Sequence, residues 1–140
     1  MRFSVPKAQI IIRFIPGITF FLEGAQKFLY PDTLGIGRFI KLGIHNPTFW
    51  APTVGGIEIL FGLFLIFGLL TRYATIPLLA IMVAAFIYTK LPLLLNEGFL
   101  PMFHAYRTDF ALTLCLIYLL VTGAGPYSLD YNPRKRRRYY

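Results

Sequence analysis

Six ionisable residues lie within or at the edges of long apolar stretches of this sequence. Three are basic and three are acidic: Arg13, Glu23, Lys27, Glu58, Arg107 and Asp109. A lone charge costs about 2.5–3.5 kcal/mol at the centre of a bilayer by insertion scales, so a balanced set indicates pairing. Carboxylates inside a membrane also commonly belong to ion pathways and proton relays. The same residues are therefore the candidate site for proton or ligand chemistry.

Helical spacing restricts which of these charges can meet. Glu23 and Lys27 are four residues apart, so they can pair on one face of a helix. Arg107 and Asp109 are two apart, roughly 200° around a helix, so each needs a partner elsewhere. From the estimated depths we expect Arg107 to pair with Glu58 or Glu23. Asp109 is expected to pair with Lys27.

Glu58 and Asp109 are the candidate proton acceptors of this polar cluster. Glu58 is the stronger candidate, because it lies deepest and has no basic residue four positions away. Arg107 and Lys27 complete the cluster as hydrogen-bond donors. Arg13 is kept apart from it, nearer the opposite membrane face. The alternative interpretation is that these charges only fix the packing of helices and do no chemistry.

Other redox and metal chemistries have little support in the sequence. Cys115 is the single cysteine, so no CxxC pair exists, and its apolar surroundings are typical of a small buried side chain. His45, His104 and Glu97 could form a shallow metal site, but their spacing fits no metal motif and we expect none. The apolar stretches contain no haem-ligating histidine pair. A complete redox enzyme is therefore not expected from this chain alone.

These residues must be positioned by membrane-spanning helices. The 140 residues are 56% hydrophobic and 14% charged, with a mean hydropathy of +0.62, which is typical of a membrane protein. Four stretches are long enough to cross a bilayer: about 8–29, 50–70, 73–90 and 105–123. We predict an all-α membrane protein, a single antiparallel four-helix domain over 1–130, followed by a basic tail over 131–140.

The distribution of basic residues predicts the orientation of this bundle. Five cluster directly after the last span: Arg134, Lys135, Arg136, Arg137 and Arg138. By the positive-inside rule both termini are cytoplasmic, and the loops 30–49 and 91–104 face outward. The basic tail fits a topology signal or a contact with anionic lipid headgroups, not a nucleic-acid site. The segment 33–50 is too polar to span and could form a short amphipathic helix on the outer surface.

Small residues indicate where the helices could approach closely. They are Gly55, Gly56 and Gly62 on the second span, and Ala80 and Ala84 on the third. Close approach matters because apolar helices gain little from hydrophobic association inside lipid.

With these residues in view, the chain resembles the DoxX family of small four-span prokaryotic membrane proteins. The matching stretches are "RFIPGITFFLEGAQKF" from Arg13, "GRFIKLGIHNP" from Gly37, "GGIEILFGLFLIFGLLTRYATIPLLAIM" from Gly55, "HAYRTDF" from His104 and "GAGPYSLD" from Gly123. Positions that resemble the family pattern are Arg13, Lys27, Glu58, Gly62, Gly68, Arg72, Arg107, Asp109 and the turn Gly125-Pro126. Ala105 departs from it, because an acidic residue is expected after His104. The resemblance implies a four-helix bundle in a prokaryotic plasma membrane.

The resemblance also implies a class of function. The family takes its name from a subunit of a terminal quinol oxidase, and relatives are described as membrane parts of quinone-dependent oxidoreductases or as partners of oxidative-stress enzymes. We therefore expect an integral subunit of an oxidoreductase complex that interacts with quinone, holds no covalently bound cofactor and associates with other subunits or with itself. Phe20, Phe61 and Phe64 could line a quinone ring site. Two alternatives stay open: a non-catalytic scaffold or assembly partner of a soluble redox or stress-response enzyme, and a small proton or ion transporter.

Overall fold

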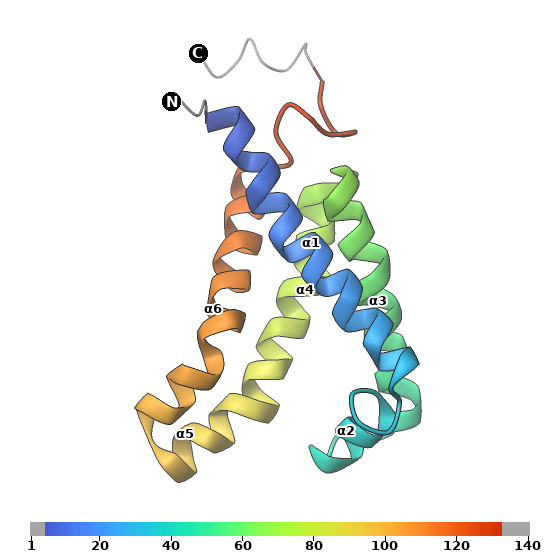
Figure 1. Cartoon of the computed structure of the whole chain (residues 1–140), viewed down its shortest axis with the longest axis vertical. Helices are drawn as coiled ribbons and strands as arrows, with labels where there is room; N and C mark the ends of the chain where they lie inside the picture. Colours follow the sequence, from blue (N-terminus) through green and yellow to red (C-terminus); the bar gives the residue numbers. More distant parts are fainter. Residues whose placement is uncertain (1–4, 133–140) are drawn as a thin grey trace.

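The computed structural model describes residues 5–132, and this part of the chain is helical without a strand (Figure 1). In order, the elements are α1 (Val5–Leu29), α2 (Ile36–Lys41), α3 (Pro47–Phe67), α4 (Thr71–Ala85), the π-helix η1 (Phe86–Lys90), α5 (Leu91–Glu97) and α6 (Phe99–Thr122). Within residues 5–132, four helical stretches are long and apolar enough to cross a membrane: Lys7–Leu29, Pro47–Phe67, Thr71–Glu97 and Phe99–Thr122. The predicted all-α, four-span membrane fold is confirmed. The basic tail residues 134–138 lie outside the described residues.

The third and fourth spans differ from their predicted limits. The third was expected to end at residue 90, but α4, η1 and α5 follow one another to Glu97. The fourth begins at Phe99 instead of 105, because only Gly98 separates α5 from α6. The prediction of a loop over residues 91–104 is therefore wrong, because all of these residues except Gly98 are helical. The apolar run "LPLLL" that follows Lys90 is compatible with a longer helix, but the sequence interpretation did not use this signal.

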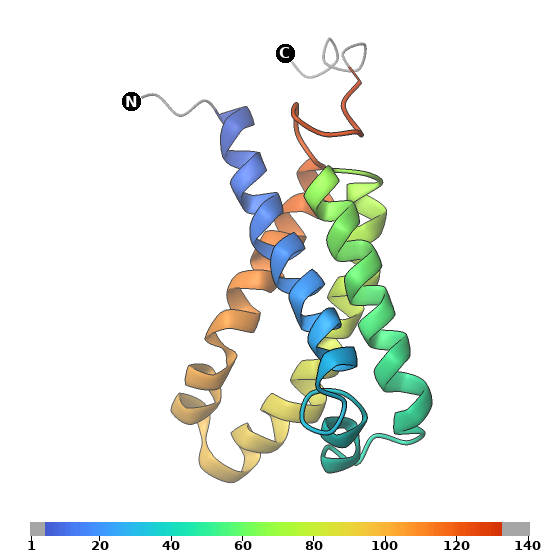
Figure 2. The same ribbon diagram turned by 45° about the vertical axis from the view of Figure 1, so that its right-hand side comes forward.

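The four long helices form an antiparallel bundle in which each contacts its two neighbours. α1 packs along α3, α3 against α4, α4 against α6, and α6 against α1. The start of α1 and the residues after α6 lie at the same end as the α3–α4 turn (Figures 1 and 2). We call this the terminal end, and the opposite end, with α2 and α5, the loop end. The short amphipathic helix allowed by segment 33–50 is present as α2, with Phe39 buried and Arg38 and Lys41 exposed.

Glycines set the closest helix contact, between α1 and α3. Gly17 lies against Gly62, and two turns away Gly24 lies against Gly55. A Cβ atom on Gly24 would come 2.6 Å from the carbonyl oxygen of Gly55, nearer than packed atoms can lie. The predicted role of Gly55 and Gly62 is therefore confirmed. Gly56 instead has open space around it and takes no part in this contact.

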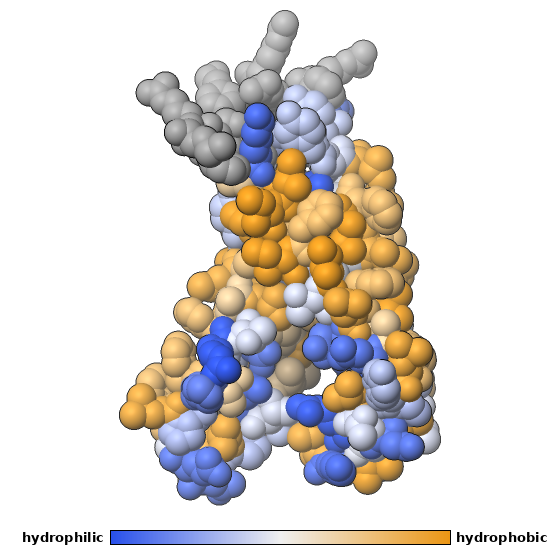
Figure 3. All heavy atoms as spheres, in the orientation of Figure 1, coloured by the Kyte–Doolittle hydropathy of each residue, from blue (hydrophilic) through white to orange (hydrophobic). Residues whose placement is uncertain are grey.

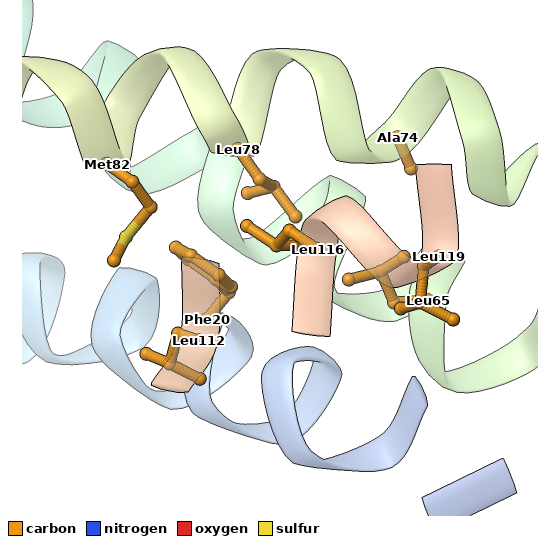
Figure 4. Close-up of a cluster of buried hydrophobic side chains, with 8 residues drawn as sticks. All are labelled: Phe20, Leu65, Ala74, Leu78, Met82, Leu112, Leu116 and Leu119. Atoms are coloured by element: carbon orange, nitrogen blue, oxygen red, sulfur yellow. The ribbon is translucent and has the colours of Figure 1, made fainter. Parts of the chain in front are cut away.

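The buried core fills the middle of the bundle and its terminal half. Figure 4 shows side chains from all four long helices meeting there: Phe20, Leu65, Ala74, Leu78, Met82, Leu112, Leu116 and Leu119. Ala80 and Ala84 are exposed, so the small pair predicted to bring helices together faces out of the bundle. Large apolar side chains also cover the outward faces, visible as the orange band in Figure 3, and these faces contact the bilayer.

Residues 123–132 close the terminal end by satisfying the backbone of the α3–α4 turn. The Asp130 carboxylate accepts hydrogen bonds from the backbone N–H groups of Leu70 (2.6 Å) and Thr71 (2.7 Å), the first donors of α4. The backbone N–H of Asp130 donates a hydrogen bond to the carbonyl of Gly68 at 2.9 Å. Gly68 ends α3 with φ +67°, a left-handed conformation that favours glycine. A distant segment thus caps a helix whose own flanking residues supply no side-chain cap.

The loop end, by contrast, divides into two lobes (Figures 1 and 2). One lobe contains α2 with the adjoining ends of α1 and α3, and the other contains η1, α5 and the start of α6. Contacts of α5 are made with η1 and α6, within its own lobe. Figure 3 shows hydrophilic residues on both sides of the hollow between the lobes. The polar candidate residues must therefore be placed on one lobe or the other.

Candidate functional site

A buried ion pair joins α1 to α3. Lys27 Nζ lies 2.7 Å from Glu58 Oε2, and the two side chains are only 12% and 5% exposed. Because α1 and α3 are antiparallel, Lys27 and Glu58 lie on opposite sides of the Gly24–Gly55 contact along the helix axis. The close backbones at this contact let the long Lys27 side chain, whose Cβ lies beside Gly55, reach Glu58. Lys27 therefore pairs with Glu58, and its predicted pairing with Asp109 is wrong. The sequence had identified both residues but not their contact.

Glu23 does not form the helical pair predicted with Lys27. Its side chain is exposed, and Lys27 Nζ instead donates a long hydrogen bond to the Glu23 backbone oxygen at 3.5 Å. The stronger contact with Glu58 draws the ammonium group across to α3. Glu23 therefore contributes negative charge near the pair without direct contact.

Asp109 pairs with Lys90, the last residue of the predicted third span, which the sequence interpretation did not include in the polar cluster. Lys90 Nζ lies 3.3 Å from Asp109 Oδ2, with side chains 15% and 29% exposed. Lys90 ends η1, and because the helix continues into α5, its side chain can face α6. The predicted partner, Lys27, belongs to the other lobe. The signal that could have revealed Lys90 was the apolar sequence after it.

The predicted pairing of Arg107 with Glu58 or Glu23 is also wrong. The Arg107 side chain is exposed on α6. Nη1 lies 2.6 Å from Nε2 of His104 and donates to the His104 backbone oxygen at 3.1 Å. The predicted polar cluster thus separates into two groups: Glu23, Lys27 and Glu58 on one lobe, and Arg107 and Asp109 on the other. In the second group Asp109 contacts Lys90 and Arg107 contacts His104.

Arg13 lies apart from the cluster, as predicted, and holds the terminal end together. It is 3% exposed. Nη1 donates to the Ala124 carbonyl at 3.0 Å, and Nη2 donates to the Tyr127 carbonyl at 2.8 Å. These bonds tie the segment after α6 to α1, which gives Arg13 a structural role. Asp130, which shares this end, was missed by the sequence interpretation.

The described residues contain no group of three His, Cys, Asp or Glu side chains that could hold a metal ion. Cys115 is a free, half-buried thiol within α6. What the arrangement offers chemically is a buried ammonium–carboxylate pair in an apolar bundle. Oε1 of Glu58 has no hydrogen-bond partner in residues 5–132, so it can accept a proton or hydrogen bond from a ligand.

Comparison with known proteins agrees with this membrane architecture. A Mycobacterium tuberculosis protein named "Uncharacterized membrane protein Rv3486" is 47% identical over 137 residues, covering 94% of this chain and 84% of that protein. The Bacillus subtilis protein named "Putative oxidoreductase CatD" is 32% identical over 132 residues, covering 93% and 90%. No solved structure gives a significant match. The DoxX family profile matches residues 8–91, and the chain is a member of the DoxX family of membrane proteins.

Proposed function

We propose that this chain is a quinone-interacting subunit of a membrane oxidoreductase, with the Lys27–Glu58 pair as the polar part of its site. The observation that carries the proposal is a carboxylate that is 5% exposed inside an apolar bundle, with one oxygen paired and the other available. A relative named as an oxidoreductase supports the general class. The quinone itself is inferred from the family resemblance and from the chemistry of the pair.

The pair has the groups that a quinone ring requires. Lys27 carries three N–H donors, of which one binds Glu58 and one reaches weakly toward a backbone oxygen, so one can donate to a ring oxygen. Glu58 can accept the proton of a quinol hydroxyl. Phe61 follows Glu58 by one helical turn, and its ring makes an edge contact with Phe64 at 5.6 Å between centroids. Phe20, the third predicted aromatic residue, is buried in the core, and Phe61 and Phe64 are partly buried against that core.

Electrons taken from a quinol would pass to a partner. The proposed function is therefore a binding and proton-accepting role within a complex that includes a separate redox subunit. We place this complex in a prokaryotic plasma membrane with the terminal end on the cytoplasmic side, as the positive-inside rule predicts. The proposed pair then lies nearer the outward-facing end of α1.

A specific observation favours the scaffold alternative as the second candidate. Both acidic residues proposed as proton acceptors are already paired with lysines, Glu58 with Lys27 and Asp109 with Lys90. A charge that is neutralised within the protein needs no ligand, and its role could be limited to holding helices together. In that case the function is to hold a soluble redox or stress-response enzyme at the membrane.

The deciding experiment measures quinone in organic extracts of protein purified in mild detergent. Wild type would be compared with Glu58→Gln and with the control Glu97→Gln, which makes the same chemical change at an exposed position on α5. We expect near-stoichiometric quinone in wild type and the control, and at least tenfold less in Glu58→Gln. Equal quinone in all three would contradict the proposed site. No quinone in any of them would support the scaffold.

A further inference from the structure

A second polar site lies at the loop end, between the lobes. A cleft of about 540 Å³ separates α2 from η1 and the start of α5. From one side it is lined by Thr33, Arg38 and Lys41, and from the other by Tyr88 and Thr89. None of these residues takes part in the Lys27–Glu58 pair. The cleft is thus distinct from the site of the proposed function.

The charge in this cleft is uncompensated. Arg38 and Lys41 are three residues apart, so their exposed side chains share one face of α2. Within residues 5–132, neither side chain has an ion pair or a hydrogen bond. No carboxylate lines the cleft, and the Asp109 carboxylate of the second lobe is paired with Lys90. Two like charges this close repel each other, so an anion bound between them is favoured.

Neutral donors complete the lining. The hydroxyl groups of Thr33 and Tyr88 make no hydrogen bond in the described part of the chain, so both can donate to a ligand. Thr89 cannot contribute its proton, because its hydroxyl donates to the Ala85 carbonyl at 2.5 Å. The cleft therefore offers a guanidinium, an ammonium and two hydroxyl groups. This is more donors than a carboxylate can use, and it suits a group with several oxygens around one centre.

We propose that this cleft binds a phosphate group. Arg38 offers a planar fork to two phosphate oxygens, and Lys41 supplies a second charge-assisted hydrogen bond. The volume exceeds that of phosphate alone and has room for the glycerol of a lipid headgroup. Two sources share this chemistry, an anionic phospholipid headgroup and a free phosphate. The apolar outer faces of the neighbouring helices would contact the acyl chains in the first case.

The test titrates delipidated protein in detergent with phosphatidylglycerol or diacylglycerol, read by native mass spectrometry, and with inorganic phosphate, read by calorimetry. Arg38→Gln and Lys41→Gln would be compared with Lys7→Gln, which removes an exposed charge at the terminal end. Losing one charge-assisted hydrogen bond should weaken binding about tenfold. Lys7→Gln should bind as wild type does.

The outcomes separate the two sources. Tighter binding of phosphatidylglycerol than of diacylglycerol, lost in both cleft variants, assigns the site to a lipid headgroup. Phosphate binding with the same dependence assigns it to a soluble ligand. Tyr88→Phe keeps the charges of the cleft and removes one neutral donor, so it should weaken the binding of either ligand only a few-fold. This graded effect would not be expected from a general folding defect. Unchanged binding in Arg38→Gln and Lys41→Gln, or an equal loss in Lys7→Gln, would overturn the proposal.

Discussion

Replacing Lys27 and Glu58 singly and together should show strong coupling between α1 and α3. The two side chains meet at 2.7 Å and are almost fully buried, so either single change leaves an uncompensated charge inside the bundle. Removing one partner of a buried pair typically costs about 3–5 kcal/mol, whereas replacing both with apolar side chains is often close to neutral. Methionine is a suitable replacement for both residues because it is flexible and similar in length.

The magnitudes follow from the exposure of each partner. Lys27→Met leaves the Glu58 carboxylate, which is only 5% exposed, without its partner, so it should lower the free energy of unfolding by about 3 kcal/mol. Glu58→Met should cost less, about 2 kcal/mol, because the longer lysine chain at 12% exposure can turn its head toward water. The double variant should lie within about 2 kcal/mol of wild type, giving a coupling energy of about 3 kcal/mol.

Equilibrium unfolding in mixed micelles of dodecyl maltoside and sodium dodecyl sulfate would measure these values. Trp50, the only tryptophan in the sequence, lies in the first turn of α3 and reports on its environment by fluorescence. Additive single effects would refute the direct ion pair. Quinone content would be measured on the same samples. A double variant that is stable yet lacks quinone fits a ligand site, and one that is stable and retains quinone removes the pair from that role.

Three further predictions test the packing. Gly24→Ala should destabilise the bundle by about 1–3 kcal/mol through overpacking against α3, while Gly56→Ala, which meets open space, should be neutral or slightly stabilising in the same assay. Asp130→Ala should cost about 1–2 kcal/mol by removing the cap of α4, and a thermal stability in detergent equal to wild type would contradict this role. Exchanging Lys90 and Asp109 should be tolerated better than reversing either charge alone, although this partly exposed pair contributes only about 1 kcal/mol. Equal losses of stability in all three variants would argue against pairing.

The membrane fold could be predicted because length and hydropathy directly determine it. An apolar segment of about twenty residues in lipid must satisfy its backbone internally, and a helix does this. Boundaries were less certain where a charged residue interrupts an apolar run. Lys90 was taken as the end of the third span, yet the helix continues past it to Glu97, and its ammonium pairs with Asp109.

The pairs could not be predicted because depth does not define direction around a helix. Asp109 and Lys27 have similar depths, but they project from different lobes, and only the arrangement of helices reveals this. The close approach of Gly24 and Gly55 was predicted only in part, because the sequence interpretation named Gly55 but not Gly24. The Asp130 cap joins residues 60 positions apart, a separation at which no local pattern is informative.

The placement of charges explains why the two ends of the bundle differ. At the terminal end, Arg13 and Asp130 bind the segment after α6 to α1 and to the α3–α4 turn, so distant elements are fixed together. At the loop end, each of the two ion pairs found in residues 5–132 joins helices within one lobe. These charges stabilise each lobe without closing the space between them. The cleft of the proposed phosphate site lies between the lobes and is lined from both of them, so a ligand bound there would add a link that these ion pairs do not supply.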